Sequence, residues 1–248
     1  MRKISITVAG HGRQMLPGLP RPYQEINRVN LEENLKGATY VDSLPNSNLK
    51  SELFSEYPVF WSSMSNELPR LQFGLFHYRC FLDLQNQNHS DITLDFSKRS
   101  HVSRVQRKAA KNLVGKIVLS KPLDFSIDGF SAWDQFVHCH PDAENDLIRA
   151  CQRFELSTNL DAVRILKISS KLYSRNIFFA PIVFAQDWNR ISSEILDFFG
   201  TCGFESKTDR PGGYILERLF SVWAMQYEKQ ENFLTRNFIY FRHQEDVV

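Results

Sequence analysis

Short apolar runs that end in glycine, proline or polar residues alternate along this chain with longer segments of helical periodicity. Strand-like runs lie at 3–10, 70–76, 116–122, 172–181 and 235–242. Between them, 182–200 and 210–230 repeat apolar residues at helical spacing. This alternation constrains the fold most strongly, because strands that are connected by helices pair into a parallel sheet covered by helices. The sequence therefore predicts an α/β fold with a mostly parallel central sheet, in a single domain over 1–248.

Charge balance and cysteine spacing argue against several classes of protein. The net charge of +2 comes from 30 basic and 28 acidic side chains, which is too balanced to favour nucleic acid as a partner. The four cysteines are scattered, so neither a zinc site nor a disulfide framework is predicted. No run approaches the ~18 apolar residues of a membrane helix, and the first apolar run lacks the features of a signal peptide. A cytoplasmic location is therefore expected.

The triplet His77-Tyr78-Arg79 directly follows the apolar run at 73–76. In open α/β sheets, residues just past the carboxyl end of a strand line the ligand crevice. A guanidinium there binds a carboxylate or phosphate with two prongs, and a tyrosine stacks on a base or bonds a sugar hydroxyl. A histidine binds phosphate or metal, or moves a proton. The structural alternative is a buried salt bridge for Arg79 and a satisfied core hydrogen bond for His77.

The segment RPGGYILERLFSVW at 210–223 is a second candidate site. Gly212 and Gly213 lead into a helix, whose first backbone N–H groups form an anion site when they are free. Glu217 lies on an otherwise apolar helix and needs a partner. It is either a general base for a sugar hydroxyl or the structural partner of a cation such as Arg218. The sequence leaves both roles open.

Three other places carry weaker patterns. The loop HGRQMLPGLPRPYQ at 11–24 follows the first strand, where such folds place ligand contacts, and it is either such a site or a plain surface loop. Asn176 precedes an apolar strand and either bonds a sugar hydroxyl or caps a loop. A basic helix over 98–111 is either a solvated face or a contact surface for phosphate or anionic lipid headgroups.

Three motifs together resemble one bacterial glycosyltransferase family of capsule and O-antigen loci, long catalogued only as a domain of unknown function. GLFHYRCF at 74–81 is similar to its Gly-Leu-x-His-Tyr-Arg-Arg-Tyr/Phe motif. NIFF at 176–179 resembles its Asn-Met-Phe-Ile stretch, and GYILERLFSVW at 213–223 resembles its Gly-Phe-Ile-x-Glu-Arg-Leu-x-x-x-Trp pattern. The order and separations of the motifs fit. Cys80 departs from the pattern, because it stands where the family has a second arginine.

The resemblance implies a Rossmann-like domain of the nucleotide-diphospho-sugar transferase (GT-A) type. It implies an enzyme that moves a hexose, in some relatives a galactofuranose, from a nucleotide-diphosphate sugar to a growing surface polysaccharide or lipid-linked glycan. The expected donor is a UDP-sugar. The sequence contains no Asp-x-Asp metal motif, so no metal ligand is predicted and a need for a divalent metal stays open.

In this hypothesis, Glu217 and His77 are the catalytic residues. Cations at the site would neutralise the donor diphosphate. The expected substrate-binding residues are His11, Tyr78, Arg79, Asn176, Arg210, Gly213 and Arg218. The expected partners are a nucleotide sugar and a glycan acceptor, without nucleic acid, and 98–111 would contact the inner membrane. The alternative, which Cys80 favours, is a non-catalytic glycan-binding or scaffolding relative in a polysaccharide assembly complex.

Overall fold

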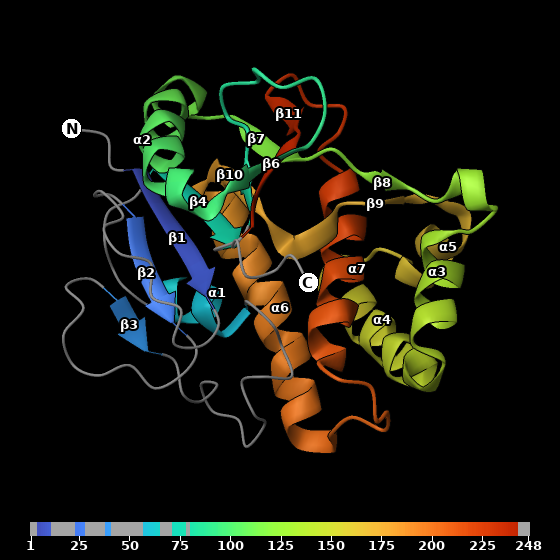
Figure 1. Ribbon diagram of the computed structural model, residues 1–248. Coiled ribbons are helices and arrows are strands. Elements are labelled where there is room, and N and C mark those ends of the chain that lie inside the picture. The colour runs from blue at the N-terminus through green and yellow to red at the C-terminus, as the bar shows by residue number, and fades with distance from the viewer. Residues whose placement is uncertain are drawn as a thin grey trace.

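A computed structural model of the chain describes residues 4–10, 23–27, 38–40, 57–64, 71–77 and 80–242. Its main feature is a 10-stranded sheet (Figure 1). The main path of this sheet runs through β11 (Phe233–Arg236), β7 (Ile117–Ser120), β10 (Phe178–Pro181), β4 (Gln72–His77), β1 (Ile4–Gly10), β2 (Tyr23–Asn27) and β3 (Ala38–Tyr40). The strands β1, β4, β7 and β10 match the apolar runs of the sequence.

Most strand pairs on this path are parallel, as the sequence predicts. The strands β4, β1, β2 and β3 pair in parallel with one another in that order, and β7 pairs in parallel with β11. The exception is β10, which lies antiparallel to both β4 and β7 in the middle of the sheet. The amino end of β10 therefore lies at the same edge as the carboxyl ends of β4 and β7, a juxtaposition that the sequence does not predict.

A branch of the sheet departs from the end of β4. The strand β5 (Cys80–Leu82) pairs antiparallel with β4 through His77 and Cys80. The strand β12 (Phe238–Arg242) pairs with β5 and with β6 (Ile92–Asp95). The single strand expected over 235–242 is therefore two strands, which separate at the buried Asn237. A small second sheet joins β8 (Leu123–Asp124) to β9 (Lys171–Leu172).

The central strands β4, β7 and β10 are covered on both faces, which explains why they are largely apolar and buried. Phe73 and Leu75 of β4 belong to one core cluster and Phe76 to the other, as the twofold periodicity of a strand requires. The first cluster joins the sheet to α1 (Tyr57–Met64), α3 (Ala132–Cys139), α4 (Glu144–Thr158), α5 (Ala162–Ile168), α6 (Ile182–Cys202) and α7 (Pro211–Met225). The second cluster joins it to α2 (Arg99–Ala110), β5 and β12.

Local sequence signals account for where several helices begin and end. The sequence predicts a helix over 44–68 that Pro58 would interrupt. In the structure α1 begins at Tyr57, so Pro58 lies in its first turn, where a missing N–H is tolerated. Ser131 and Asp134 form a capping box at the start of α3. Asn159 ends α4 in a left-handed conformation. Within the described residues, no helix has both the length and the apolar character needed to span a bilayer.

Candidate functional site

Strand directions bring polar residues from distant parts of the sequence to one edge of the main sheet. This edge, called the carboxyl edge below, is where β1 ends at Gly10 and β4 ends at His77. Phe178 of β10 pairs with Leu75 of β4, and the two strands run antiparallel. This pairing ends at Phe178, so Asn176, two residues earlier in the chain, lies just beyond the amino end of β10 at this edge. Ligands of open α/β sheets bind at such an edge.

Two residues in the turn before β10 have an uncommon backbone. Arg175 and Asn176 both have positive φ angles, 69° and 51°. Asparagine tolerates this left-handed region, whereas arginine occupies it at a cost, so surrounding contacts must hold it there. Asn176 is buried, and its Oδ1 accepts a hydrogen bond from the hydroxyl of Tyr57 at 2.8 Å. The side-chain amide of Asn176 thus ties the carboxyl edge to α1.

Glu217 of α7 holds the backbone of Arg175 in place. Its Oε1 accepts a hydrogen bond from the Arg175 backbone N–H. Its Oε2 accepts a hydrogen bond from Nη1 of Arg218 at 2.7 Å. The Glu217 side chain is only 16% exposed. Each carboxylate oxygen has two lone pairs, so each can still accept a second hydrogen bond from a ligand hydroxyl.

Arg218, which follows Glu217 in α7, is almost fully buried. Its guanidinium also donates to the side-chain oxygen of Gln135 and lies over the ring of Phe136, 5.3 Å from the centroid. Burial lowers the pKa of Arg218, and the neighbouring Glu217 carboxylate opposes this effect. In this geometry Arg218 positions Glu217, while direct contact with a substrate stays a prediction.

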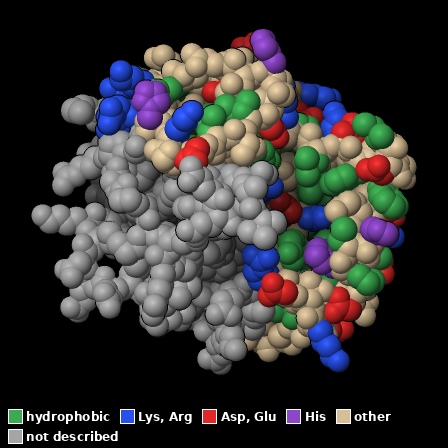
Figure 2. All heavy atoms as spheres, viewed as in Figure 1, with side chains coloured by type: hydrophobic (Ala, Val, Ile, Leu, Met, Phe, Trp, Pro, Cys, Tyr) green, Lys and Arg blue, Asp and Glu red, His purple; other side chains and the backbone are tan. Residues whose placement is uncertain are grey.

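Arg210 and the rings of Tyr214 and His140 lie near the start of α7, on the N-terminal side of Glu217. Arg210 lies over Tyr214, 5.9 Å from the ring centroid, and Tyr214 stacks on His140 at 4.2 Å. Burial lowers the pKa of His140, and the charge of Arg218 lowers it further. In Figure 2, basic, acidic and histidine side chains gather beside the grey residues where α7 and α3 lie. Glu217 follows Arg210 by two helical turns, or ~10 Å along the axis.

Two aspartates fix the loop that leads into α7. The carboxylate of Asp146 accepts hydrogen bonds from the backbone N–H groups of Glu205 and Ser206. Asp142 accepts from the backbone N–H of Lys207 at 2.7 Å. At the helix start itself, the N–H of Gly213 donates to the carbonyl oxygen of Arg210 at 3.1 Å. The Gly213 N–H is therefore already engaged, which weakens the argument for Gly213 as an anion donor.

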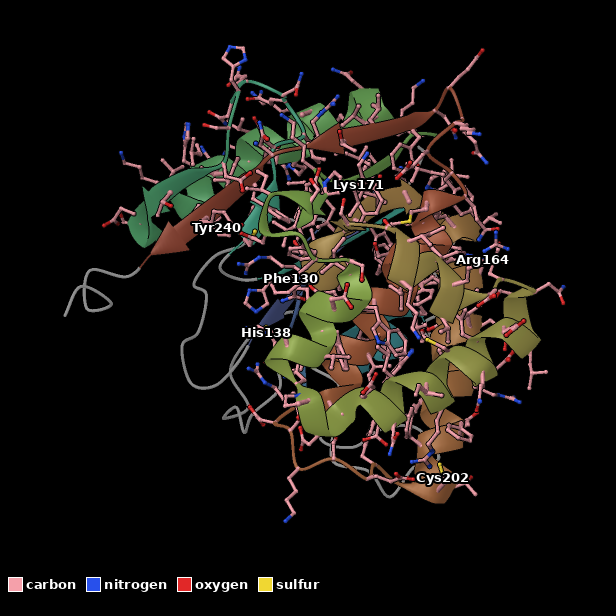
Figure 3. The ribbon with its side chains drawn as sticks, turned by 90° about the vertical axis from the view of Figure 1, so that its right-hand side faces the viewer. Phe130, His138, Arg164, Lys171, Cys202 and Tyr240 are labelled. Carbon is pink, nitrogen blue, oxygen red and sulfur yellow. The ribbon has the colours of Figure 1, made fainter. Side chains whose placement is uncertain are left out.

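The guanidinium of Arg175 lies against β12. It lies 5.0 Å from the ring centroid of Tyr240 and 5.9 Å from that of Phe238. Burial raises the pKa of Tyr240, while the neighbouring charge of Arg175 acts in the opposite direction. Figure 3 labels Tyr240 on this part of the molecule. Arg175 was not predicted as a site residue, since its only sequence signal is its position next to Asn176.

Cys80 lies close to this guanidinium but does not face solvent. Its side chain is 0% exposed and belongs to the second core cluster. It pairs in register with Tyr240 of β12. Burial raises the pKa of the Cys80 thiol, and the charge of Arg175 opposes the rise. The position where the family that the sequence resembles has a second arginine is therefore a core position here, next to a cation from another segment.

The structure brings together some of the predicted site residues. His77, Asn176, Glu217 and Arg218 lie at or beside the carboxyl edge, and Arg210 is the residue directly before α7. His11, Tyr78 and Arg79 lie outside the described residues. In the part of the chain that the structure describes, no group of three or more His, Cys, Asp or Glu side chains is placed to hold a metal ion.

The fold and site together define an α/β protein with a mixed sheet and a polar cluster where such sheets bind ligands. A solved structure with the same fold is the WbbM bifunctional glycosyltransferase in its apo form, with a TM-score of 0.74 and 14% sequence identity. The match covers 96% of this chain and 45% of that one, so this chain spans less than half of its length. No family model matches the chain, and no curated protein matches it. The predicted glycosyltransferase fold is therefore confirmed, whereas membership of the His-Tyr-Arg family stays a prediction.

Proposed function

We propose that this protein is a glycosyltransferase that moves a hexose from a nucleotide-diphosphate sugar to a growing surface polysaccharide or lipid-linked glycan. The observation that carries the proposal is the Glu217 carboxylate, held beside the carboxyl edge by the Arg175 N–H and by Arg218. The fold supports the same class, because its structural neighbour is a glycosyltransferase. Galactofuranose is one hexose that the resemblance in sequence suggests.

In this proposal the donor is a UDP-sugar whose diphosphate lies at the carboxyl edge near His77 and Arg79. Cationic side chains and oriented N–H groups neutralise the charge that develops on a departing diphosphate. Asn176 and Tyr78 position the base or the sugar, and Arg210 and His11 complete the binding site. Whether a divalent metal assists the reaction is decided by assays with and without manganese.

Glu217 would receive the acceptor sugar. The remaining lone pairs of its two oxygens accept hydrogen bonds from sugar hydroxyls. A carboxylate in this place orients the attacking hydroxyl and takes its proton as the new glycosidic bond forms. Arg218 supports this role, because its buried guanidinium fixes the rotamer of Glu217.

The basic face of α2 would bring the protein to its acceptor. Ala109 and Ala110 of α2 are buried against the second core cluster, whereas Arg104, Lys108 and Lys111 are exposed. Residues 99–110 contain no acidic side chain. Basic and histidine side chains gather over α2 at the upper left of Figure 2. The proposed partner of this face is the anionic inner leaflet of the membrane, where a lipid-linked acceptor is presented.

The test combines ligand binding with turnover. A thermal-shift screen of the wild-type chain against UDP, GDP and CDP, with and without manganese, is expected to raise Tm with one nucleotide, since a ligand stabilises the folded state by mass action. Transfer or hydrolysis is then measured with the corresponding nucleotide sugars. Glu217→Gln is expected to lower turnover about 10²- to 10⁴-fold while nucleotide binding persists.

Glu155→Gln is the matched control, because Glu155 is exposed on α4. The control is expected to behave as wild type in both assays. Thermal unfolding of each variant without ligand separates a catalytic loss from misfolding. The proposal is wrong if no nucleoside diphosphate changes Tm and no nucleotide sugar is turned over. A chain that then binds glycans alone would support the non-catalytic alternative.

A further inference from the structure

Arg175 is an exposed cation at the carboxyl edge. Its side chain is exposed, and its guanidinium lies over the rings of Tyr240 and Phe238. Its backbone is held in the left-handed region by a hydrogen bond to Glu217 and is followed by the buried Asn176. The guanidinium charge is thus held near Glu217, the residue proposed to bind the acceptor, and near the end of β4.

The guanidinium of Arg175 retains hydrogen-bonding capacity. Contact with an aromatic face uses the flat surface of the guanidinium and leaves the N–H donors in its plane available. Within the described residues, no carboxylate lies within salt-bridge distance of Arg175, whereas Arg149, Arg190 and Arg218 each have at least one such partner.

We propose that Arg175 binds the diphosphate of the nucleotide-sugar donor, an inference that rests on the proposed function. Guanidinium groups bind phosphate oxygens with two parallel hydrogen bonds, and an arginine that is already ordered loses less conformational freedom when it binds. The same arrangement explains why position 80 can be a cysteine instead of an arginine. The cation near position 80 comes from the segment before β10, so a second arginine in β5 is not needed.

The strained backbone of Arg175 suits this role. A left-handed arginine is less stable than a left-handed glycine or asparagine, so stability alone does not favour arginine at this position. Residues kept in such conformations cluster at binding sites, where they aim a side chain or a backbone group. Here the conformation directs the N–H of Arg175 to Glu217 and its guanidinium to β12.

The experiment compares a nucleotide with its phosphate-free nucleoside. Arg175→Asn removes the charge but keeps a residue that tolerates positive φ, so the fold is expected to persist. Arg175→Lys retains the positive charge but lacks the two parallel N–H donors of a guanidinium. Arg164→Asn is the control, because Arg164 is exposed on α5 and lies far from Tyr240 in Figure 3. Isothermal titration calorimetry measures the binding of UDP and of uridine to each variant. If the wild type prefers GDP or CDP, that nucleotide and its own nucleoside are used instead.

Arg175→Asn is expected to weaken UDP binding about tenfold to a hundredfold, while uridine binding stays unchanged. Arg175→Lys is expected to recover part of the loss, and Arg164→Asn is expected to bind as wild type. Equal UDP binding by wild type and Arg175→Asn would overturn the inference and leave the proposed function standing. An equal loss of UDP and uridine would also overturn it, because it would show a structural role. A wild type that binds no nucleoside diphosphate would overturn the proposed function and this inference with it.

Discussion

The side chain of Cys80 shows how burial limits what a single residue does in this molecule. The thiol lies in the core with Phe76 and Phe81, and burial raises its pKa. A buried thiol of raised pKa stays protonated and behaves as a small apolar group. The absence of an arginine at this position therefore says little about the carboxyl edge, where Arg175 supplies a charge. This weakens the argument from Cys80 for a non-catalytic protein.

Cys80→Arg is expected to lower the free energy of unfolding by at least about 3 kcal/mol, because it places an unpaired charge and extra volume in a packed core. Chemical denaturation followed by tryptophan fluorescence measures the change. Leu156→Arg is the control, since Leu156 is 77% exposed, and its effect should be small. A variant of unchanged stability would show that position 80 opens toward solvent.

Among the elements, β10 has the greatest consequence for the site. The sequence predicts a strand over 172–181, but the structure divides this stretch into β9, a turn over Ser174–Asn176 and β10. The apolar pattern of the sequence does not reveal this turn. The turn nevertheless sets the direction of β10, which runs antiparallel to its neighbours in the sheet. Its direction brings Arg175 and Asn176, rather than Pro181, to the carboxyl edge.

The helix α2 carries a prediction at the same scale. Lys108→Glu combined with Lys111→Glu is expected to weaken binding to anionic phospholipid vesicles at least tenfold, because each basic residue near the surface contributes about 1 kcal/mol. Co-sedimentation with phosphatidylglycerol vesicles measures the binding. Lys207→Glu combined with Lys229→Glu makes the same change in net charge at exposed positions elsewhere. If both double variants bind equally, α2 is an ordinary solvated face.

For the molecule as a whole, Gly74 of β4 lies where side chains from the two neighbouring strands approach the backbone closely. A Cβ at this position would lie 3.1 Å from Cδ2 of Phe179 in β10 and 3.3 Å from Cγ1 of Ile6 in β1. Both neighbours belong to the second core cluster. A glycine in the middle of a strand normally weakens it, so this one is explained by the close approach of two side chains. The strands on either side of β4 are those that define the carboxyl edge.

Gly74→Val is expected to destabilise the fold by about 1 to 3 kcal/mol, since Phe179 and Ile6 are buried and have little room to move. The midpoint of guanidinium chloride unfolding measures the change. Thr93→Val in β6 is the comparison, because Thr93 is exposed and the substitution suits a strand. A midpoint that moves equally little in both variants would mean that β4 shifts to accept the larger side chain.

The sequence by itself determined the class of fold and singled out several of the polar residues that lie at the carboxyl edge. Apolar periodicity is a local property, so the runs that become β1, β4, β7 and β10, and the helices α6 and α7, are visible in it. His77, Asn176 and Glu217 are also visible, because polar residues at the ends of apolar segments stand out. Only the tertiary structure decided the direction of β10, the burial of Cys80 and the place of Arg175. These depend on pairing between strands far apart in sequence and on a left-handed backbone held by Glu217, which no local pattern encodes.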